Sequence, residues 1–207
     1  STFAGIACPG SGLNRNSNPT LSDLTGDGLL DMILGCWDGT LNYYKNTGSI
    51  GNPTFTLDNS VFNTLVSPPD VEYAATPALV DVDKDGDFDL VAGGTDGQDG
   101  RIYYFENVGS TSIPKFEERI GAGMNPFDHI GPFPYPTKHK MYGGKQASEG
   151  KYLTPAFYDL NGGGKEDLFV GDWGGTVAYF KRNICTQISP CSGFSNCPTI
   201  TSSDPTC

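Results

Sequence analysis

The sequence predicts an all-β protein in which one antiparallel unit occurs three times. No segment sustains the i, i+3, i+4, i+7 spacing of apolar residues that an amphipathic helix needs. The 207 residues include 28 Gly and 15 Pro, a composition typical of many turns and short strands. Segments beginning at Pro19, Pro77 and Pro155 share one pattern, and an internal repeat of this kind predicts the architecture.

Each repeat has the same order of parts. An apolar segment leads into a turn rich in Asp and Gly, and a second apolar run, such as residues 89–92, predicts the next strand. The segments Trp37-Asp38-Gly39 and Trp173-Gly174-Gly175 predict hairpins, because glycine adopts the positive φ of tight turns. A strand with adjacent aromatic residues follows, and these are Tyr43-Tyr44, Tyr103-Tyr104-Phe105 and Tyr179-Phe180. We expect three or four strands per unit, stacked on their neighbours because one sheet cannot bury both faces alone.

The repeats belong to a β-repeat domain of residues 1–183. They cover about residues 19–57, 77–118 and 155–183. An insertion of about residues 119–150 separates the second repeat from the third. Residues 184–207 are rich in Cys, Ser, Thr and Pro, which predicts an extended tail suited to O-glycosylation. The apolar N-terminal segment, residues 1–10, is also extended and could add a strand to a neighbouring subunit.

The turn of the second repeat predicts a calcium site. It places aspartates at positions 81, 83, 85, 87 and 89. Calcium takes about six to eight oxygen ligands, and like charges this close need a counter-ion. Counted from Asp81, carboxylates stand at loop positions 1, 3, 5 and 9, Gly86 supplies the bend, and Asp87 offers its backbone carbonyl. The spacing is that of the first half of an EF-hand loop without its flanking helices. The alternative is a turn whose aspartates bond their own backbone.

The turn of the first repeat offers fewer carboxylates. Asp23, Asp27 and Asp31 hold positions 1, 5 and 9. Position 3 is Thr25, where a hydroxyl or a water would replace the carboxylate, and Leu29 offers only its carbonyl. We expect weaker calcium binding here, because affinity follows the number of charged ligands.

The turn of the third repeat has the weakest set. Asp159, Asn161 and Asp167 hold positions 1, 3 and 9, while Gly163 leaves position 5 without a ligand. Lys165 would contribute its carbonyl and would lower the local negative charge. The three loops together predict between one and three Ca²⁺ ions.

These units resemble the FG-GAP/VCBS repeat family, the blade-like repeats of integrin α-subunit propellers and of many extracellular proteins. The literal Phe-Gly and Gly-Ala-Pro landmarks are not present, and Leu34-Gly35, Ala92-Gly93 and Val170-Gly171 stand nearest to the first of them. The resemblance implies β-propeller-like blades with calcium between the first two strands of each. Propellers use about four to eight blades. We therefore expect terminal segments, flanking sequence or a neighbouring chain to complete the array.

Charge and cysteine content restrict the binding partners and the cellular location of the protein. The net charge of -11 excludes nucleic-acid binding and disfavours anionic membranes, and no apolar run reaches the roughly 20 residues that span a bilayer. The six cysteines favour disulfides over zinc, because C-x-x-C pairs with histidine partners are missing. They are Cys8, Cys36, Cys185, Cys191, Cys197 and Cys207. We expect an extracellular or cell-surface protein, with the pairing left open.

The sequence does not predict an enzyme. The only histidines, His129 and His139, lie in the insertion, and no nucleophile elbow or phosphate-binding loop is present. The insertion is instead a candidate partner or glycan surface, or a cover over an open sheet edge. The surface candidates are Phe127, His129, Phe133, Tyr135 and Tyr142.

Three functions remain open at this stage, and the third of them, a hydrolase with an unrecognised site, has no motif to support it. The first is a calcium-binding structural or adhesive protein that assembles with other chains, including self-association into a filament. The second is a calcium-dependent carbohydrate-binding module that uses Trp37, Trp173 and the paired tyrosines as stacking platforms. Packing of these aromatics in the sheet cores is the competing explanation for their repeated spacing.

Overall fold

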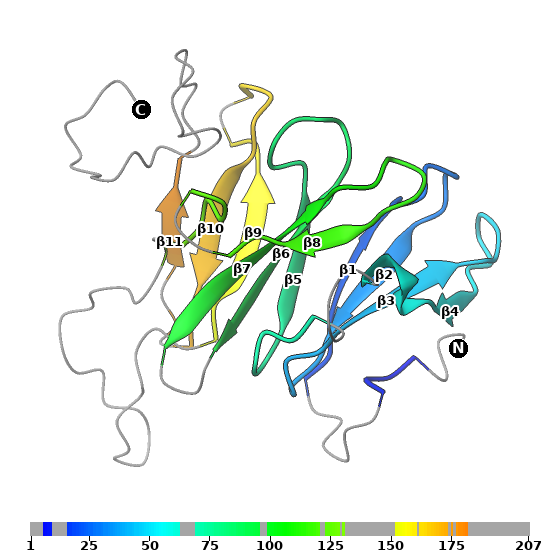
Figure 1. The fold of residues 1–207 in the computed structure, drawn as a ribbon, viewed down its shortest axis with the longest axis horizontal. Coiled ribbons are helices and arrows are strands. Elements are labelled where there is room, and N and C mark those ends of the chain that lie inside the picture. Colours follow the sequence, from blue (N-terminus) through cyan, green and yellow to red (C-terminus); the bar gives the residue numbers. More distant parts are fainter. Residues whose placement is uncertain are drawn as a thin grey trace.

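The computed structural model describes residues 6–9, 16–62, 69–95, 99–120, 123–128, 130, 152–160, 162–173, 175 and 177–181. Within these residues eleven β-strands form three antiparallel sheets, and the one helical element is the 3-10 turn η1 (Asn59–Phe62) (Figure 1). The predicted all-β class is confirmed. In this part of the chain no helix combines the length and the apolar character that crossing a bilayer requires.

Each sheet is one repeat, folded as a meander in which every strand pairs with the next. Sheet 1 contains β1 (Asn18–Ser22), β2 (Asp31–Gly35), β3 (Leu41–Asn46) and β4 (Phe55–Leu57). Sheet 2 contains β5 (Thr76–Val80), β6 (Asp89–Thr95), β7 (Gly100–Asn107) and β8 (Phe116–Glu118). Sheet 3 contains β9 (Thr154–Tyr158), β10 (Asp167–Gly171) and β11 (Val177–Phe180). The prediction of three or four antiparallel strands per repeat is confirmed.

The strand register is equivalent in the three sheets over their first three strands. In each sheet the second strand begins with an Asp and ends at or beside a Gly, and the pairing with the third strand follows the same positions. The equivalent pairs are Ile33 with Tyr43, Val91 with Tyr104 and Phe169 with Tyr179. Because side chains alternate between faces along a strand, equivalent residues lie on equivalent faces.

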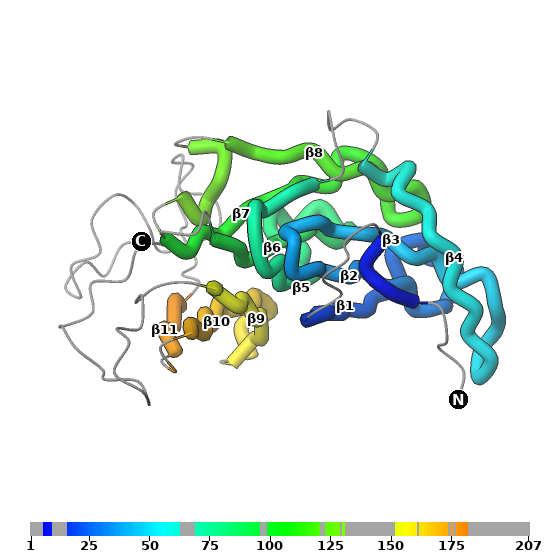
Figure 2. Tube along the Cα trace, turned by 90° about the horizontal axis from the view of Figure 1, so that it is seen from below, coloured from blue at the N-terminus to red at the C-terminus, as the bar shows by residue number. Residues whose placement is uncertain are grey.

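The sheets stack through their faces. β1 lies beside β5, and β5 beside β9, so the first strands form one side of the array (Figure 2). Ile33 of sheet 1 shares a core with Leu90 and Ala92 of sheet 2, and Val91 of sheet 2 shares the next core with Leu168 of sheet 3. The predicted stacking is confirmed. The described residues form an open array of three sheets rather than a closed propeller.

Two glycines allow this close stacking. A β-carbon on Gly35 would lie 2.3 Å from the carbonyl oxygen of Ala75, and one on Gly93 would lie 1.8 Å from that of Leu153. Ala75 and Leu153 immediately precede the first strands of sheets 2 and 3. Glycine is therefore required where the chain that leads into the next sheet crosses β2 or β6.

At each of these two places, a side chain at the start of the sheet's first strand donates a hydrogen bond to the chain that leads into the next sheet. Asn18 Nδ2 donates to the carbonyl oxygen of Ala75 (3.1 Å), and the Thr76 hydroxyl donates to that of Leu153 (2.6 Å). Sheets 1 and 2 meet at one joint, and sheets 2 and 3 meet at another. Each joint has a glycine in contact with the chain that leads into the next sheet, and a side-chain hydrogen bond to the carbonyl oxygen of that chain.

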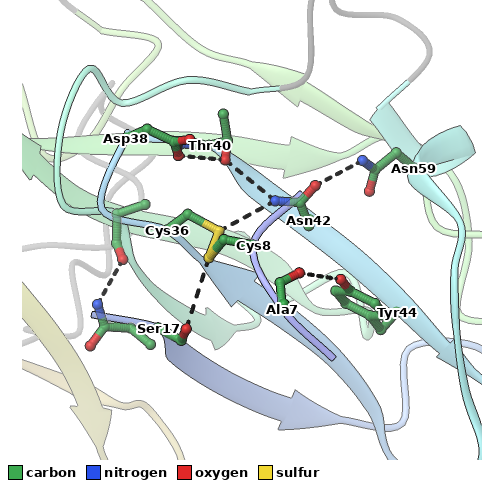
Figure 3. Close-up of a disulfide and its surroundings, with 11 residues drawn as sticks. Ala7, Cys8, Ser17, Cys36, Asp38, Thr40, Asn42, Tyr44 and Asn59 are labelled. Atoms are coloured by element: carbon green, nitrogen blue, oxygen red, sulfur yellow. Dashed lines mark hydrogen bonds between the residues drawn. A yellow bond between two sulfur atoms is a disulfide. The ribbon is translucent and has the colours of Figure 1, made fainter. Parts of the chain in front are cut away.

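The described N-terminal residues lie on sheet 1 of their own chain. Cys8 forms a disulfide with Cys36, and the Tyr44 hydroxyl donates to the carbonyl oxygen of Ala7 at 2.6 Å (Figure 3). Residues 6–9 thus contact their own sheet 1, and the strand addition to a neighbouring subunit suggested for residues 1–10 stays a prediction. Cys185, Cys191, Cys197 and Cys207, with the whole tail 184–207, lie outside the described residues.

Candidate metal centre

The three acidic loops lie where the sequence predicts them, between the first two strands of each sheet. They span residues 23–30, 81–88 and 159–166. Tight backbone bends shape the second loop, since Lys84 has φ 69° and Gly86 has φ 102°. The left-handed conformation is freely open to Gly86 and unusual for Lys84.

The first aspartate of each loop organises the turn. Asp23 accepts the Gly28 N–H at 2.8 Å, and Asp81 accepts the Lys84 N–H at 2.7 Å. Asp159 accepts the Gly163 and Gly164 N–H groups at 3.0 and 2.7 Å. The bonding of these aspartates to their own backbone is thus present. A carboxylate has about four lone-pair sites, so this role leaves room for a metal ligand on the same side chain.

The ninth position of the loop is a buried carboxylate that opens the second strand. Asp89 is 1% exposed, its Oδ1 accepts the Asn107 N–H at 2.7 Å, and its Oδ2 accepts the Val82 N–H at 2.9 Å. The Tyr104 hydroxyl also donates to Oδ2, at 3.2 Å. The equivalent Asp31 accepts an N–H of the third strand at the same distance as Asp89 does. The ninth position therefore connects each of these two loops to the end of the third strand.

The partner residues, Asn46 and Asn107, continue this connection. Asn46 Oδ1 accepts the N–H groups of Gly48 and Thr54, both at 3.1 Å. Asn107 Oδ1 accepts those of Gly109 and Lys115, at 3.1 and 2.9 Å. The asparagines therefore fix the turn between the third and fourth strands. Sequence reasoning assigned them no role, although the shared N-x-G-S pattern at residues 46–49 and 107–110 was the signal for it.

Three carboxylates converge in the second loop. One oxygen each of Asp81, Asp83 and Asp89 lies within 4.8 Å of the other two. These are the predicted ligands at positions 1, 3 and 9. The group does not include Asp85 or Asp87. The side chain of Asp87, expected to offer only its carbonyl, is buried, and its Oδ1 has no hydrogen-bond partner among the described residues.

The electrostatics of the second loop favour a bound cation. Burial raises the pKa of Asp89 to about 7, against the lowering effect of the N–H groups of Asn107 and Val82. Burial, followed by the charges of Asp85, Asp83 and Asp81, raises the pKa of Asp87 to about 6. Desolvation and like charges both disfavour the ionised forms, and an ion of opposite charge removes both penalties. The donor set, all hard oxygen, fits Ca²⁺.

The first loop contains buried oxygens that fit the same ion. Asp31 is fully buried, and its Oδ2 lacks a hydrogen-bond partner among the described residues. The Thr25 hydroxyl, predicted as the ligand at position 3, is also buried there without a partner. Burial raises the pKa of Asp31. Asp27 accepts the Leu29 N–H at 2.9 Å, and the Leu29 carbonyl remains a predicted ligand.

Comparison with known proteins finds one family model that matches the part of the chain holding these two loops. Residues 23–92, from the start of the first loop to the strand after the second, match the family model described as FG-GAP-like repeat. This part of the chain, about a third of the whole, is similar to FG-GAP-like repeats. The resemblance predicted from the sequence is confirmed. No curated protein matches the chain.

The third loop lies beyond the matched FG-GAP-like repeat and is less complete. Asp167 is buried and accepts the Tyr179 hydroxyl at 3.0 Å. Asn161, the predicted ligand at position 3, lies outside the described residues, and Lys165 is half-buried. Lys84 of the second loop forms an ion pair with Glu166 of the third at 2.6 Å. This ion pair connects the second loop to the third.

The predicted partner surface in the insertion is wrong at Phe127. This side chain is fully buried and packs edge-to-face against Tyr104 and Phe157, at centroid distances of 5.9 and 6.0 Å. Phe127 thus fills the core between sheets 2 and 3. The other candidates, His129, Phe133, Tyr135 and Tyr142, lie outside the described residues.

The aromatics considered as stacking platforms divide into two groups. Tyr43, Tyr44 and Tyr104 are buried in the cores, which confirms the packing explanation for them. Trp37 and Trp173, from hairpins of sheets 1 and 3, both contact Tyr152, at centroid distances of 5.4 and 5.5 Å. These three rings form an aromatic cluster in which Trp173 remains 54% exposed.

Proposed function

We propose that this protein is an extracellular, non-catalytic calcium-binding structural protein whose stacked sheets bind other protein chains. The observation that carries the proposal is the convergence of Asp81, Asp83 and Asp89 at one end of a buried strand. Three carboxylates within 4.8 Å of one another repel unless a cation or protons neutralise them. FG-GAP-like repeats and the Cys8–Cys36 disulfide both suit an extracellular protein.

The ion would have a structural role. Asp89 accepts a hydrogen bond from the N–H of Asn107. The side-chain oxygen of Asn107 in turn accepts hydrogen bonds from two N–H groups of the turn that leads into β8. A cation at the second loop would therefore stabilise the ionised Asp89 carboxylate. Through Asn107 this carboxylate is hydrogen-bonded to the end of β7 and, indirectly, to the turn before β8. Asp31 and Asn46 provide the same path in sheet 1. We assign the second loop as the strongest site and the first loop as the next.

Calcium titration tests this proposal. Isothermal titration calorimetry of the chelator-treated chain is expected to show at least one Ca²⁺ site, and the melting temperature should rise with calcium. At about 100 times Kd one ion adds about 2.7 kcal/mol, or roughly 5–10 °C for a domain of this size. Mg²⁺ at the same concentration is the control and should shift melting less, because it retains its waters. Superimposed melting curves in calcium and in chelator would refute the proposal.

A carbohydrate-binding function is the second candidate. The observation that favours it is the cluster of Trp37, Tyr152 and Trp173, which brings both tryptophans of the chain together. An exposed indole face is a common platform for the apolar face of a sugar ring. A glycan array with the intact chain and with Trp173→Ala tests this function. Binding that needs Trp173 would support the lectin, and an array without hits would exclude it.

A further inference from the structure

The two outer sheets each present an apolar face that no other described sheet covers. Sheets 1 and 3 stand at opposite ends of the array (Figure 1). The open face of sheet 1 contains a groove of about 630 Å³, lined among others by Leu21, Met32 and Ile50. The open face of sheet 3 presents Val177 and Tyr179, which are 70% and 47% exposed.

The exposed positions of sheet 3 are buried in the other two sheets. Val177 pairs with Gly171, just as Leu41 pairs with Gly35 and Ile102 with Gly93. Leu41 and Ile102 are 0% and 4% exposed. Each is buried in the core shared with the following sheet. The open face of sheet 3 is therefore the side that receives a following sheet.

The tyrosines at the equivalent position of the third strands are also buried in sheets 1 and 2 and exposed in sheet 3. Tyr43 and Tyr104 are 1% and 3% exposed within the two joints, whereas Tyr179 stands in the open. Val177 and Tyr179 lie on one face of β11, so two neighbouring positions that the other sheets bury are exposed together on sheet 3.

Sheet 3 also has the two residues that contact the incoming chain at a joint, a glycine and a side-chain hydrogen-bond donor. Gly171 occupies the position of Gly35 and Gly93, yet the nearest described atom to a β-carbon there is the Thr154 carbonyl oxygen of its own sheet, at 4.0 Å. Thr154 occupies the position of Thr76, whose hydroxyl bonds the chain that leads into the next sheet. Sheet 3 thus has the glycine and the hydroxyl of a joint without a following sheet among the described residues.

The open face of sheet 1 is the other half of the joint. Met32 and Leu34 stand where sheet 2 has Leu90 and Ala92, the residues that contact the preceding sheet. Both lie on the side of sheet 1 that no other described sheet covers. Residues 6–9 pack on that side and leave Met32 and Leu34 only 6% and 3% exposed, and the groove lies beside them. One chain therefore carries both complementary halves, one at each end.

We propose that the open face of sheet 3 binds the open face of sheet 1 of a second copy of this chain, head to tail. The residue before β1, Ser17, would then cross Gly171 as Ala75 crosses Gly35. This inference names the partner for the assembly role in the proposed function and rests on it. A head-to-tail contact gives a closed ring if its rotation closes and a filament if it does not.

Charge modulates this association. With a net charge of -11 two copies repel, and salt screens the repulsion over about 8–10 Å. We expect association to strengthen with ionic strength. Calcium bound in the loops would act in the same direction by lowering the net charge.

Two charge substitutions, one on each face, test the proposal. Leu21→Asp places a carboxylate in the sheet 1 groove and Val177→Asp places one on sheet 3, both at exposed positions that folding tolerates. Analytical ultracentrifugation of the full chain at physiological salt should show self-association. Each variant alone should weaken it at least about tenfold, the size of an interface hot spot. Ile113→Asp, at a 73% exposed position in the β7–β8 turn, is the matched control and should change Kd less than about twofold.

Mixing the two variants distinguishes head-to-tail pairing from other contacts. Leu21→Asp retains an intact sheet 3 face, and Val177→Asp retains an intact sheet 1 face. Their equimolar mixture should form a 1:1 dimer at a concentration between the wild-type Kd and the raised Kd of either variant, at which each variant alone is mostly monomeric. Dimers of Val177→Asp alone would show a contact between two sheet 1 faces and would overturn the proposal. A strictly monomeric wild-type chain, with its faces covered by its own remaining segments, would overturn it too.

The same samples in calcium and in chelator separate this inference from the proposed function. A chain that binds calcium and remains monomeric at every concentration contradicts the inference alone. A chain that associates head to tail and binds no calcium contradicts the calcium-binding function alone.

Discussion

Asp89 Oδ1 accepts the backbone N–H of Asn107 at 2.7 Å, so the residue that opens β6 holds the residue that ends β7. Asp31 and Asn46 have the same relationship, also at 2.7 Å, in sheet 1. The carboxylate is thus part of the sheet before any ion binds. In the second loop it is also one of the three converging carboxylates. Asp89 therefore has two roles, as a hydrogen-bond acceptor within the sheet and as a candidate metal ligand. Substitutions can separate these roles.

Asp89→Asn should destabilise the chain even in chelator. The carboxylate accepts three hydrogen bonds, and an amide would direct its NH₂ group at a donor. We expect a loss of about 2–3 kcal/mol at pH 8, because a buried unsatisfied donor costs about 1–3 kcal/mol and a charged acceptor is lost as well. Urea unfolding in chelator measures it.

Asp83→Asn is the matched control for Asp89→Asn. Asp83 is exposed and its Oδ1 accepts the Asp85 N–H at 3.2 Å, a hydrogen bond that an amide oxygen can also accept. We expect a change within about 0.5 kcal/mol in chelator and a calcium affinity at least about tenfold lower. Equal destabilisation by the two variants in chelator would contradict the separation of roles.

The stability of the calcium-free chain should fall as pH rises from 5 to 8. The pKa of Asp87 is raised to about 6 and that of Asp89 to about 7, so the folded state binds more protons than the unfolded state in this window. The stabilisation is complete below the ordinary pKa near 3.8 and is lost as pH passes through the raised values. Saturating calcium should reverse the trend, because the ion binds the ionised carboxylates. Melting curves at four pH values measure both trends, and a rise in chelator between pH 5 and 8 would contradict the prediction.

Removal of the Cys8–Cys36 disulfide should destabilise sheet 1. The bond closes a loop with a sequence separation of 28 residues and fixes residues 6–9 on the sheet. Cys8→Ser with Cys36→Ser should cost about 3.6 kcal/mol by the loop-entropy relation. Tyr44→Phe, which removes only the hydrogen bond to Ala7, should cost about 1 kcal/mol and is the control. Equal unfolding free energies of the double variant and the wild type would exclude a stabilising role for the bond.

The sequence predicted the features that depend on local chemistry. The Asp and Gly turns, the hairpins and the strand order are set by residues close in the chain, so the repeats located all three sheets. Features that depend on contacts between sheets were not predictable. Phe127 was assigned to a surface, because an aromatic in a Pro-rich insertion has the same local pattern whether it is packed or exposed. The pairing of Cys8 with Cys36 likewise depends on where residues 6–9 lie in space. Asn46 and Asn107 were missed, because their role is visible only once a third strand lies beside a loop.

Two glycines at equivalent positions should respond in opposite ways to alanine. Gly93→Ala places a β-carbon 1.8 Å from the Leu153 carbonyl oxygen, so sheet 3 must move away from sheet 2. Overpacking of this kind costs about 3 kcal/mol or more. Gly171→Ala meets no described atom closer than 4.0 Å, and alanine in a strand interior is about 0.5–1 kcal/mol more favourable than glycine. The single chain should therefore keep or gain stability, measured by urea unfolding at a concentration below that of self-association.

The same Gly171→Ala variant should associate poorly, because the second copy would cross this residue as Leu153 crosses Gly93. Sedimentation should show Kd raised at least about tenfold, with a melting temperature at low concentration no lower than that of the wild type. Thr56→Ala, at an exposed strand residue of β4, is the control and should leave Kd unchanged. A Gly171→Ala chain that associates like the wild type would show that nothing crosses this glycine, and it would count against the head-to-tail joint independently of the charge variants.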